Sequence, residues 1–282
     1  MSIIQLAVLG SPIAHSKSPA LHQAAYAALG LPWAYGSADV TAAELPAYVD
    51  ARDESWRGLS LTMPLKQVVL PMLDSVDRVA SLTGGANTVR FDWTDGVRSL
   101  SGYNTDVGGM VRALHEAGVG SVRHAHLLGG GATAASALVA AAELGAESAL
   151  VSVREPSRAA RLVALGDAVG VVVRVAAFDA PRSDADTQLV MSVLPGSVEA
   201  PIAFDGEFMS RVPLFDVAYD PWPTTRASVW EASGGTVVSG LPLLLHQALL
   251  QVRIFVGGDP FTALEHEDEV LSAMKSAAGS AP

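Results

Sequence analysis

The stretch AHLLGGGATAASALVAAAEL, residues 125–144, decides the fold of the central part of this chain. Ala125–Leu128 is a short apolar run typical of a buried strand, and Ala134–Leu144 has the composition of a buried helix. Three glycines lie between them, and they let the backbone turn sharply and come close to a group bound at the helix N-terminus. Read as G-x-G-x-x-A, with Ala134 as the third small residue, the loop indicates a site for the pyrophosphate of a dinucleotide.

More strands follow this stretch, with helices between the early ones. The helix that we expect after the second strand covers Arg158–Ala168. Six strands in about 120 residues predict a doubly wound, Rossmann-like parallel sheet. The five further strands are expected at Ala149–Val153, Val171–Ala176, Leu189–Val193, Leu214–Val217 and Thr236–Val238.

The end of the second strand of this sheet selects between the two nicotinamide dinucleotides. An acidic residue there binds the ribose diol of NAD, whereas an arginine favours the 2′-phosphate of NADP. The chain has Arg154 and Arg158, with Glu155 beside them. The two cations favour NADP, and Glu155 keeps NAD open. A solvated Glu–Arg pair at the surface is the third possibility.

The first hundred residues also alternate between strands and helices. We predict a helix over Pro19–Leu29, with Ser18 as its N-cap and Gly30 just beyond its end. A turn is expected at Asp95-Gly96. The remaining elements are predicted as strands at Ile3–Leu9, Gly58–Thr62 and Thr88–Trp93, and as helices from Asn104 to Gly118, Leu243 to Val256 and Phe261 to Ala277.

Composition and charge exclude several classes of function. The chain has 282 residues, half of them hydrophobic, and 18 basic against 29 acidic residues give a net charge of −11. This balance argues against nonspecific binding of nucleic acid or of an anionic membrane. No cysteine is present, which excludes disulfides and catalysis by a thiolate. No signal peptide or membrane span is recognisable, so we expect a cytoplasmic protein that binds no membrane.

Small polar residues occur in pairs where a core would not need them. Ser16 and Ser18 are two residues apart, as are Ser60 and Thr62. In extended backbone such residues face the same side, so each pair can direct two hydroxyls at one polyhydroxylated ligand. Structural roles compete with this interpretation. Ser18 and Asp106 each fit a helix N-cap, Asn87 can brace a turn, and Lys66 can be a solvated surface lysine.

Taken together and in order, these motifs resemble those of the shikimate dehydrogenase family. The N-terminal match follows the pattern G-x-P-x-x-H-S-x-S-P-x-x-H, and matches continue over nearly the whole chain. In addition to the glycine loop, the matching stretches are LGSPIAHSKSPALH (9–22), LTMPLK (61–66), GANT (85–88), GYNTD (102–106), DVAYDP (216–221) and GLPLLLHQA (240–248).

The resemblance implies an α/β substrate domain, residues 1–103 and 241–282, and a Rossmann-like NADP-binding domain, residues 104–240. It implies reversible, NADPH-dependent reduction of 3-dehydroshikimate to shikimate in chorismate and aromatic amino acid biosynthesis. The protein would be a monomer or homodimer and would need no metal. Lys66 and Asp106 would be the catalytic pair. The implied substrate ligands are Ser16, Ser18, Ser60, Thr62, Lys66, Asn87, Asp106, Tyr219 and Gln247. The implied cofactor ligands are Gly129, Gly130, Gly131, Ala132, Thr133, Arg154, Arg158, Val217 and Gly240.

Two departures from the family pattern leave alternatives open. The family usually has Asn where Ser60 stands, and Asn-Arg-Thr where this chain has Val153-Arg154-Glu155. The nearest alternative is an NAD-dependent quinate/shikimate dehydrogenase, which would keep almost all of these residues. A second alternative is a non-catalytic, NAD(P)-sensing regulator, which would not need Lys66 together with Asp106.

Overall fold

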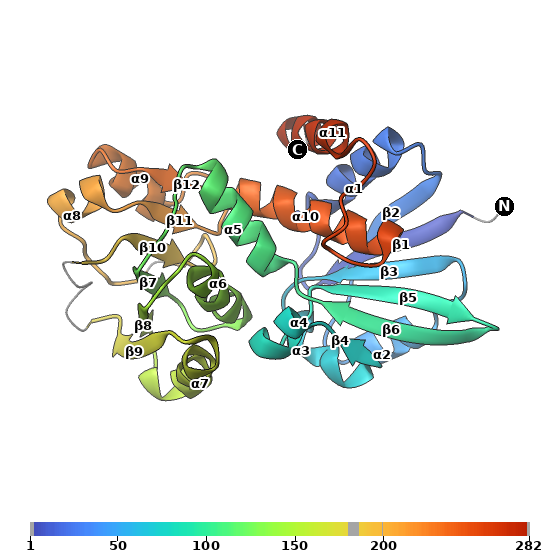
Figure 1. Cartoon of the computed structure of the whole chain (residues 1–282), viewed down its shortest axis with the longest axis horizontal. Coiled ribbons are helices and arrows are strands. Elements are labelled where there is room, and N and C mark those ends of the chain that lie inside the picture. The colour runs from blue at the N-terminus through green and yellow to red at the C-terminus, as the bar shows by residue number, and fades with distance from the viewer. Residues whose placement is uncertain (1–2, 180–185, 199, 281–282) are drawn as a thin grey trace. The chain divides into compact units, whose positions relative to one another are not determined.

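Two six-stranded sheets organise the chain (Figure 1). The computed structural model describes residues 3–179, 186–198 and 200–280. The chain divides into a first unit, Met1–Asp106 with Leu244–Pro282, and a second unit, Val107–Leu243. Each unit contains one of the two sheets.

The sheet of the first unit is mixed, with the strand order β2-β1-β3-β5-β6-β4. β1 pairs in parallel with β2 and β3, whereas β5 pairs antiparallel with β3 and β6. The predicted turn at Asp95-Gly96 is confirmed: φ is 51° and 76° at these residues, the positive values that a two-residue hairpin requires. The strands are β1 (Ile4–Gly10), β2 (Trp33–Asp39), β3 (Trp56–Leu61), β4 (Ser75–Val76), β5 (Thr88–Thr94) and β6 (Val97–Tyr103).

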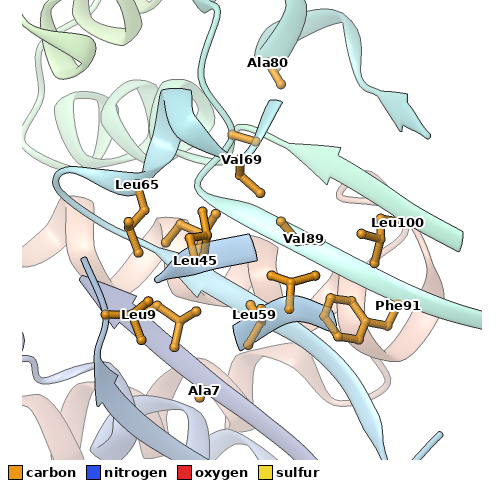
Figure 2. Close-up of a cluster of buried hydrophobic side chains, with 14 residues drawn as sticks. Ala7, Leu9, Leu45, Leu59, Leu65, Val69, Ala80, Val89, Phe91 and Leu100 are labelled. Carbon is orange, nitrogen blue, oxygen red and sulfur yellow. The ribbon is translucent and has the colours of Figure 1, made fainter. Parts of the chain in front are cut away.

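The two faces of β3 have different neighbours. Leu59 and Leu61 belong to a buried hydrophobic cluster together with Leu9 of β1. Figure 2 shows this cluster, to which Leu45 of α2 (Leu45–Asp50) and Leu65 of α3 (Leu65–Val68) also contribute. Alternation along the strand directs Gly58 and Ser60 to the opposite face. This arrangement leaves one face of β3 for the core and the other for polar contacts.

A long helix, α10 (Gly240–Gly257), covers that opposite face. A Cβ at Gly58 would lie 2.5 Å from the Phe255 ring, so only glycine lets the helix approach β3 this closely. α10 is long and apolar enough to cross a membrane by length and composition alone, but most of it is buried. Core helices can have the same length and composition, and the burial of α10 indicates that it is a core helix. The other helices of this unit are α1 (Ser18–Ala28), α4 (Arg78–Thr83), the 3₁₀ turn η1 (Leu70–Met72) and α11 (Glu267–Ser280).

Two helix starts differ from the prediction. Ser18 is the first residue of α1 and not its N-cap, because Lys17 before it already has helical dihedral angles (φ −82°, ψ −6°). α11 begins at Glu267 rather than at Phe261. The Asp259 carboxylate accepts hydrogen bonds from the backbone N–H groups of Phe261 and Thr262, at 2.7 and 2.8 Å, and this Asx turn holds the segment as a loop.

The second unit has a fully parallel sheet with the strand order β12-β11-β10-β7-β8-β9. The prediction of a doubly wound sheet is confirmed. The chain leaves β7 in one direction to β8 and β9 and then returns to β10 on the other side, so the switch point lies between β7 and β10. The strands are β7 (His124–Leu128), β8 (Ser148–Val153), β9 (Val172–Ala177), β10 (Leu189–Ser192), β11 (Leu214–Asp216) and β12 (Val237–Val238).

Helices connect these strands. α6 (Ala132–Glu143) is almost entirely buried through its small residues, as its alanine-rich sequence predicts. The end of α7 is set by Gly170, which has a left-handed conformation with φ 78°. The other helices of the unit are α5 (Asp106–Glu116), η2 (Pro156–Ala159), α7 (Ala160–Val169), α8 (Gly206–Arg211) and α9 (Thr225–Ala232).

Candidate active site

A lysine and an aspartate from distant parts of the sequence meet in the first unit. Lys66 lies on the short helix α3, and its Nζ is 2.5 Å from Oδ2 of Asp106, the first residue of α5. The two side chains are only 17 % and 9 % exposed. The backbone N–H of Ala86 donates to the Lys66 carbonyl at 2.8 Å, which fixes the start of α3. Lys66 is therefore no solvated surface lysine.

Asn87 holds the other oxygen of the Asp106 carboxylate. Its Nδ2 donates to Asp106 Oδ1 at 2.8 Å, and its Oδ1 accepts from the backbone N–H of Thr105 at 2.9 Å. Asn87 is 1 % exposed, so these bonds form away from water, where they are strongest. Both carboxylate oxygens thus have a fixed partner. Asp106 is the first residue of α5 and not its N-cap, and its carboxylate oxygens are bonded to Lys66 and Asn87.

Gln247 reaches the same group from α10. Its Oε1 lies 3.3 Å from Asn87 Nδ2, and its Nε2 donates to the Leu244 carbonyl at 3.0 Å. Thr105 Oγ1 is 2.9 Å from the same Asn87 nitrogen. Residues 66, 87, 105–106 and 247 therefore converge in one unit, as the sequence motifs predict. Thr105 belongs to a matching motif, but the sequence analysis did not single it out.

Parallel pairing brings the two serine and threonine motifs to one edge of the sheet. The carboxyl ends of β1 and β3 are neighbours, and the Thr62 N–H donates to the Leu9 carbonyl at 2.9 Å. The loop with Ser16 follows β1, while Thr62 and Lys66 follow β3. A Cβ at Gly10 would lie 2.4 Å from the Thr62 methyl group, so a glycine is needed there. Within the described part of the chain, the Thr62 hydroxyl makes no hydrogen bond.

The two serines of the N-terminal motif have different surroundings. Ser16 Oγ accepts a weak bond from the Ser18 N–H at 3.3 Å, which shapes the entry to α1. Ser18 is buried at the start of the helix, and its hydroxyl has no hydrogen-bond partner among the residues that the structure describes. Ser60, by contrast, is bonded on two sides within the chain, to Tyr35 and to Gln251.

The predicted glycine loop joins β7 to α6 in the second unit. Gly129 has φ 119°, which is strained for any other residue, and a Cβ at Gly130 would lie 2.8 Å from the Val153 side chain. Gly131 is the N-cap of α6, and a Cβ there would meet no atom within 4 Å. Ala132 and Thr133 form the first turn of the helix, whose free N–H groups attract an anion. These positions fit the pyrophosphate of a dinucleotide.

Two arginines follow β8, the strand beside β7. Both are exposed, and Arg158 Nη1 is 3.6 Å from Glu155 Oε2. That ion pair is open to solvent, with side chains 81 % and 58 % exposed, and it contributes little to stability. Arg154 forms no ion pair with any residue in the described ranges. Of the two arginines, Arg154 is therefore the one whose charge is not already paired with a carboxylate of the described residues.

The remaining predicted residues of the second unit lie around β11. A Cβ at Gly240 would lie 1.9 Å from the Val217 carbonyl oxygen, so these two backbones can meet only at a glycine. Burial raises the pKa of the Tyr219 hydroxyl, and the neighbouring Asp220 raises it further, so the phenol stays a proton donor. Asp216 is buried and accepts from Thr224 Oγ1 at 2.8 Å, which braces the loop that carries Tyr219.

Comparisons with known proteins agree with this arrangement. Residues 8–89 match the family described as shikimate dehydrogenase substrate binding domain. The shikimate dehydrogenase (NADP(+)) of Methanopyrus kandleri is 33 % identical over 266 residues, which cover 89 % of this chain and 89 % of that protein.

Solved structures show the same similarity. The Mycobacterium tuberculosis shikimate dehydrogenase is 39 % identical, with a TM-score of 0.81 over 97 % of this chain and 99 % of that one. The Thermus thermophilus shikimate 5-dehydrogenase in complex with NADP(H) and shikimate is 30 % identical, with a TM-score of 0.79 over 98 % of this chain and 100 % of that one. With a lysine–aspartate pair on one sheet edge and a glycine loop on a doubly wound sheet, this chain belongs to the shikimate dehydrogenase family.

Proposed function

We propose that this protein is an NADP-dependent shikimate dehydrogenase, which reduces 3-dehydroshikimate reversibly to shikimate in the biosynthesis of chorismate and the aromatic amino acids. The observation that carries the proposal is the buried group formed by Lys66, Asn87, Asp106 and Gln247. A non-catalytic regulator would have no use for an ammonium held this closely against a carboxylate. The first unit would bind the substrate and the second unit the cofactor.

The reduction adds a hydride to the carbonyl carbon and a proton to the carbonyl oxygen. NADPH, when bound, supplies the hydride. The residues of this chain must bind and orient the ketone, stabilise the negative charge that develops on its oxygen, and deliver the proton. The cofactor would be held by residues 129–133 of the glycine loop together with Arg154, Arg158, Val217 and Gly240.

Lys66 is the proton donor in this proposal. Its ammonium group carries three N–H bonds, of which the contact with Asp106 occupies one. The others remain to donate to the substrate oxygen as charge builds up on it, and one of these protons then transfers to complete the alcohol. In the reverse direction, the neutral amine accepts the proton from shikimate. Asp106 orients the lysine through its fixed carboxylate, and the neutral amine left after the transfer takes up a proton from solvent before the next turnover.

Polar side chains around this pair would hold the hydroxyl and carboxylate groups of the substrate. Thr62 and Ser18 have hydroxyls without a partner in the described chain, so both are free to bond to a ligand. Ser60 gives its single proton to Gln251 and accepts from Tyr35, so it is not among the proposed ligands. The proposed substrate ligands are Ser16, Ser18, Thr62, Lys66, Asn87, Asp106, Tyr219 and Gln247.

One initial-rate experiment tests this function. The purified protein is assayed with shikimate and with quinate, each against NADP and NAD. We expect the highest kcat/KM with shikimate and NADP. The exposed Glu155 keeps an NAD-dependent quinate/shikimate dehydrogenase as the second candidate, and a higher kcat/KM with NAD would favour it. No turnover with any of the four combinations would contradict both.

Other properties follow from the proposed function. The partner is a small molecule, and a net charge of −11 disfavours binding to nucleic acid or to an anionic membrane. We propose a cytoplasmic protein that works as a monomer or homodimer.

A further inference from the structure

A buried chain of hydrogen bonds connects the aromatic residues of the first unit to Asn87. Gln251 of α10 stands at its centre. Gln251 Nε2 donates to the Asn87 carbonyl at 3.2 Å, while its Oε1 lies 3.1 Å from His22 Nε2 and 2.7 Å from Ser60 Oγ. Tyr35 Oη is 2.6 Å from Ser60 Oγ, so Ser60 has a second partner besides Gln251.

The direction of each bond in this chain is determined. The Asn87 carbonyl can only accept, so the Gln251 amide must present its nitrogen there and its oxygen to His22 and Ser60. Ser60 must then donate to that oxygen, and Tyr35 must donate to Ser60. His22 must carry its proton on Nε2. Burial lowers the pKa of His22 to about 3, so the ring is neutral and has one N–H to give, in agreement with this assignment.

Ser60 is therefore occupied by the protein itself. Its single proton goes to Gln251, and one of its two lone pairs accepts from Tyr35. The neighbouring His22 and Tyr35 rings are stacked with centroids 4.0 Å apart, so the surroundings are rigid. This position differs from Thr62 two residues on, whose hydroxyl is without a partner in the described chain.

Gln251 stands one helical turn after Gln247. Residues four apart on a helix lie on the same face, about 6 Å apart along its axis. Gln247 Oε1 contacts the Asn87 side chain at 3.3 Å, and Gln251 Nε2 contacts the Asn87 main chain at 3.2 Å. The two glutamines thus hold Asn87 at both ends. Asn87 in turn holds Asp106 against Lys66.

We infer that Gln251 is a positioning residue of this active site, and that Ser60 acts on the reaction through Gln251 and does not bind the substrate. The inference rests on the proposed function. Without Gln251, the Asn87 carbonyl keeps its ladder bond from the Leu61 N–H at 2.7 Å, so the sheet remains. The variant loses the hydrogen bond from Gln251 to the Asn87 carbonyl, which holds α10, and therefore Gln247, against Asn87.

A double-mutant cycle tests the inference. Gln251→Met and Ser60→Ala should each raise KM for shikimate roughly three- to tenfold, the amount that loss of one hydrogen bond allows. KM for shikimate in the double variant should differ from KM in the Gln251→Met variant by less than about twofold. The reason is that Ser60 affects substrate binding only through its hydrogen bond to Gln251. KM for NADP should not change in any of the three. Calorimetric titration with shikimate should show the same pattern in Kd.

Other outcomes would overturn the inference. Effects that multiply in the double variant would show that Ser60 touches the substrate independently of Gln251. A rise in KM for Ser60→Ala with none for Gln251→Met would show the same, and unchanged KM in both single variants would make the network purely structural. A wild-type protein without shikimate turnover would instead refute the proposed function.

A matched control separates positioning from general loss of stability. Arg253 lies two residues further along α10, is also buried, and pairs with Glu267 of α11. Arg253→Met should lower Tm while leaving KM for shikimate unchanged. A rise in KM equal to that of Gln251→Met would overturn the inference. If Gln251→Met does not fold, Gln251→Asn replaces it, since it keeps an amide one methylene too short to reach both sides.

Discussion

The Lys66 ammonium lies 2.5 Å from the Asp106 carboxylate, and Asn87 binds the second oxygen of that carboxylate. An ion pair in contact with bulk water would contribute little to stability. Here the pair is mostly buried and has one geometry, because three other segments of the chain hold it. A lysine fixed in this way can meet the oxygen of a ketone without a search among rotamers.

Replacing Lys66 tests its role as the proton donor. Lys66→Ala should lower kcat by roughly 10²–10⁴, the contribution of a general acid. The fold and NADP binding should survive, because Lys66 belongs to the first unit and the glycine loop to the second. Steady-state kinetics and calorimetry with NADP measure both effects. A variant with more than about a third of the wild-type kcat would exclude lysine as the proton donor.

The pair should also behave as one unit. Asp106→Asn removes the charge that orients Lys66 but can keep the bond to Asn87 by rotating its amide oxygen toward it. We expect kcat to fall in this variant as well. The double variant Lys66→Ala/Asp106→Asn should lose much less than the product of the two single losses, since each residue works only with the other. Fully multiplicative losses would mean that the two side chains act separately.

Cofactor choice should depend on Arg154. A charge-assisted contact to phosphate is worth about 1.5–3 kcal/mol, or roughly ten- to hundredfold in affinity. Arg154→Ala should therefore lower the affinity for NADP by this factor and leave the affinity for NAD nearly unchanged. Arg158→Ala is the matched comparison and should have a smaller effect, because Glu155 already lies 3.6 Å from that guanidinium. Equal losses for NADP and NAD would show that neither arginine reads the 2′-phosphate.

The C-terminal segment should be needed for the first unit to fold and bind. Residues from Leu244 onward belong to that unit, and α11 packs against α1. A chain that ends at Gly240 loses Gln247 and Gln251 and exposes the face of β3 that α10 covers. It should bind no shikimate and should unfold at a lower temperature. Normal shikimate binding by this fragment would refute the role of α10.

Stability should decrease in acid because of a buried histidine. Burial lowers the pKa of His126 to about 4, whereas in the unfolded chain it is about 6.5. Between these values the unfolded state binds a proton that the folded state does not. The free energy of unfolding therefore falls as pH falls, by about 1.4 kcal/mol per pH unit for this residue. Urea unfolding at several pH values should give a slope that is smaller by this amount in His126→Gln, and equal slopes would contradict the assignment.

The order of motifs along the chain was sufficient to predict the family and the doubly wound sheet. The reason is local: glycine loops, strand periodicity and turn residues act over a few positions, and they appear directly in the sequence. The pairing of Lys66 with Asp106, 40 residues apart, was implied only by the resemblance to the family. The same reasoning overlooked β2 and α2. The strand WAYGSAD carries Gly, Ser and Asp at positions where a strand usually has branched residues, so it lacks the apolar alternation that marks other strands.

The sequence by itself, through its resemblance to the family, determined which residues we propose for the chemistry, because the proposed reaction requires particular side chains in particular motifs. The tertiary structure decided which of these side chains remain available. Ser60 and Thr62 look equivalent in sequence, two residues apart at the end of one strand. Packing of α10 against β3 ties the Ser60 hydroxyl to Gln251, 191 positions away, whereas the Thr62 hydroxyl has no hydrogen-bond partner among the described residues. No local pattern encodes this difference, because it depends on which distant donor or acceptor the fold places beside each hydroxyl.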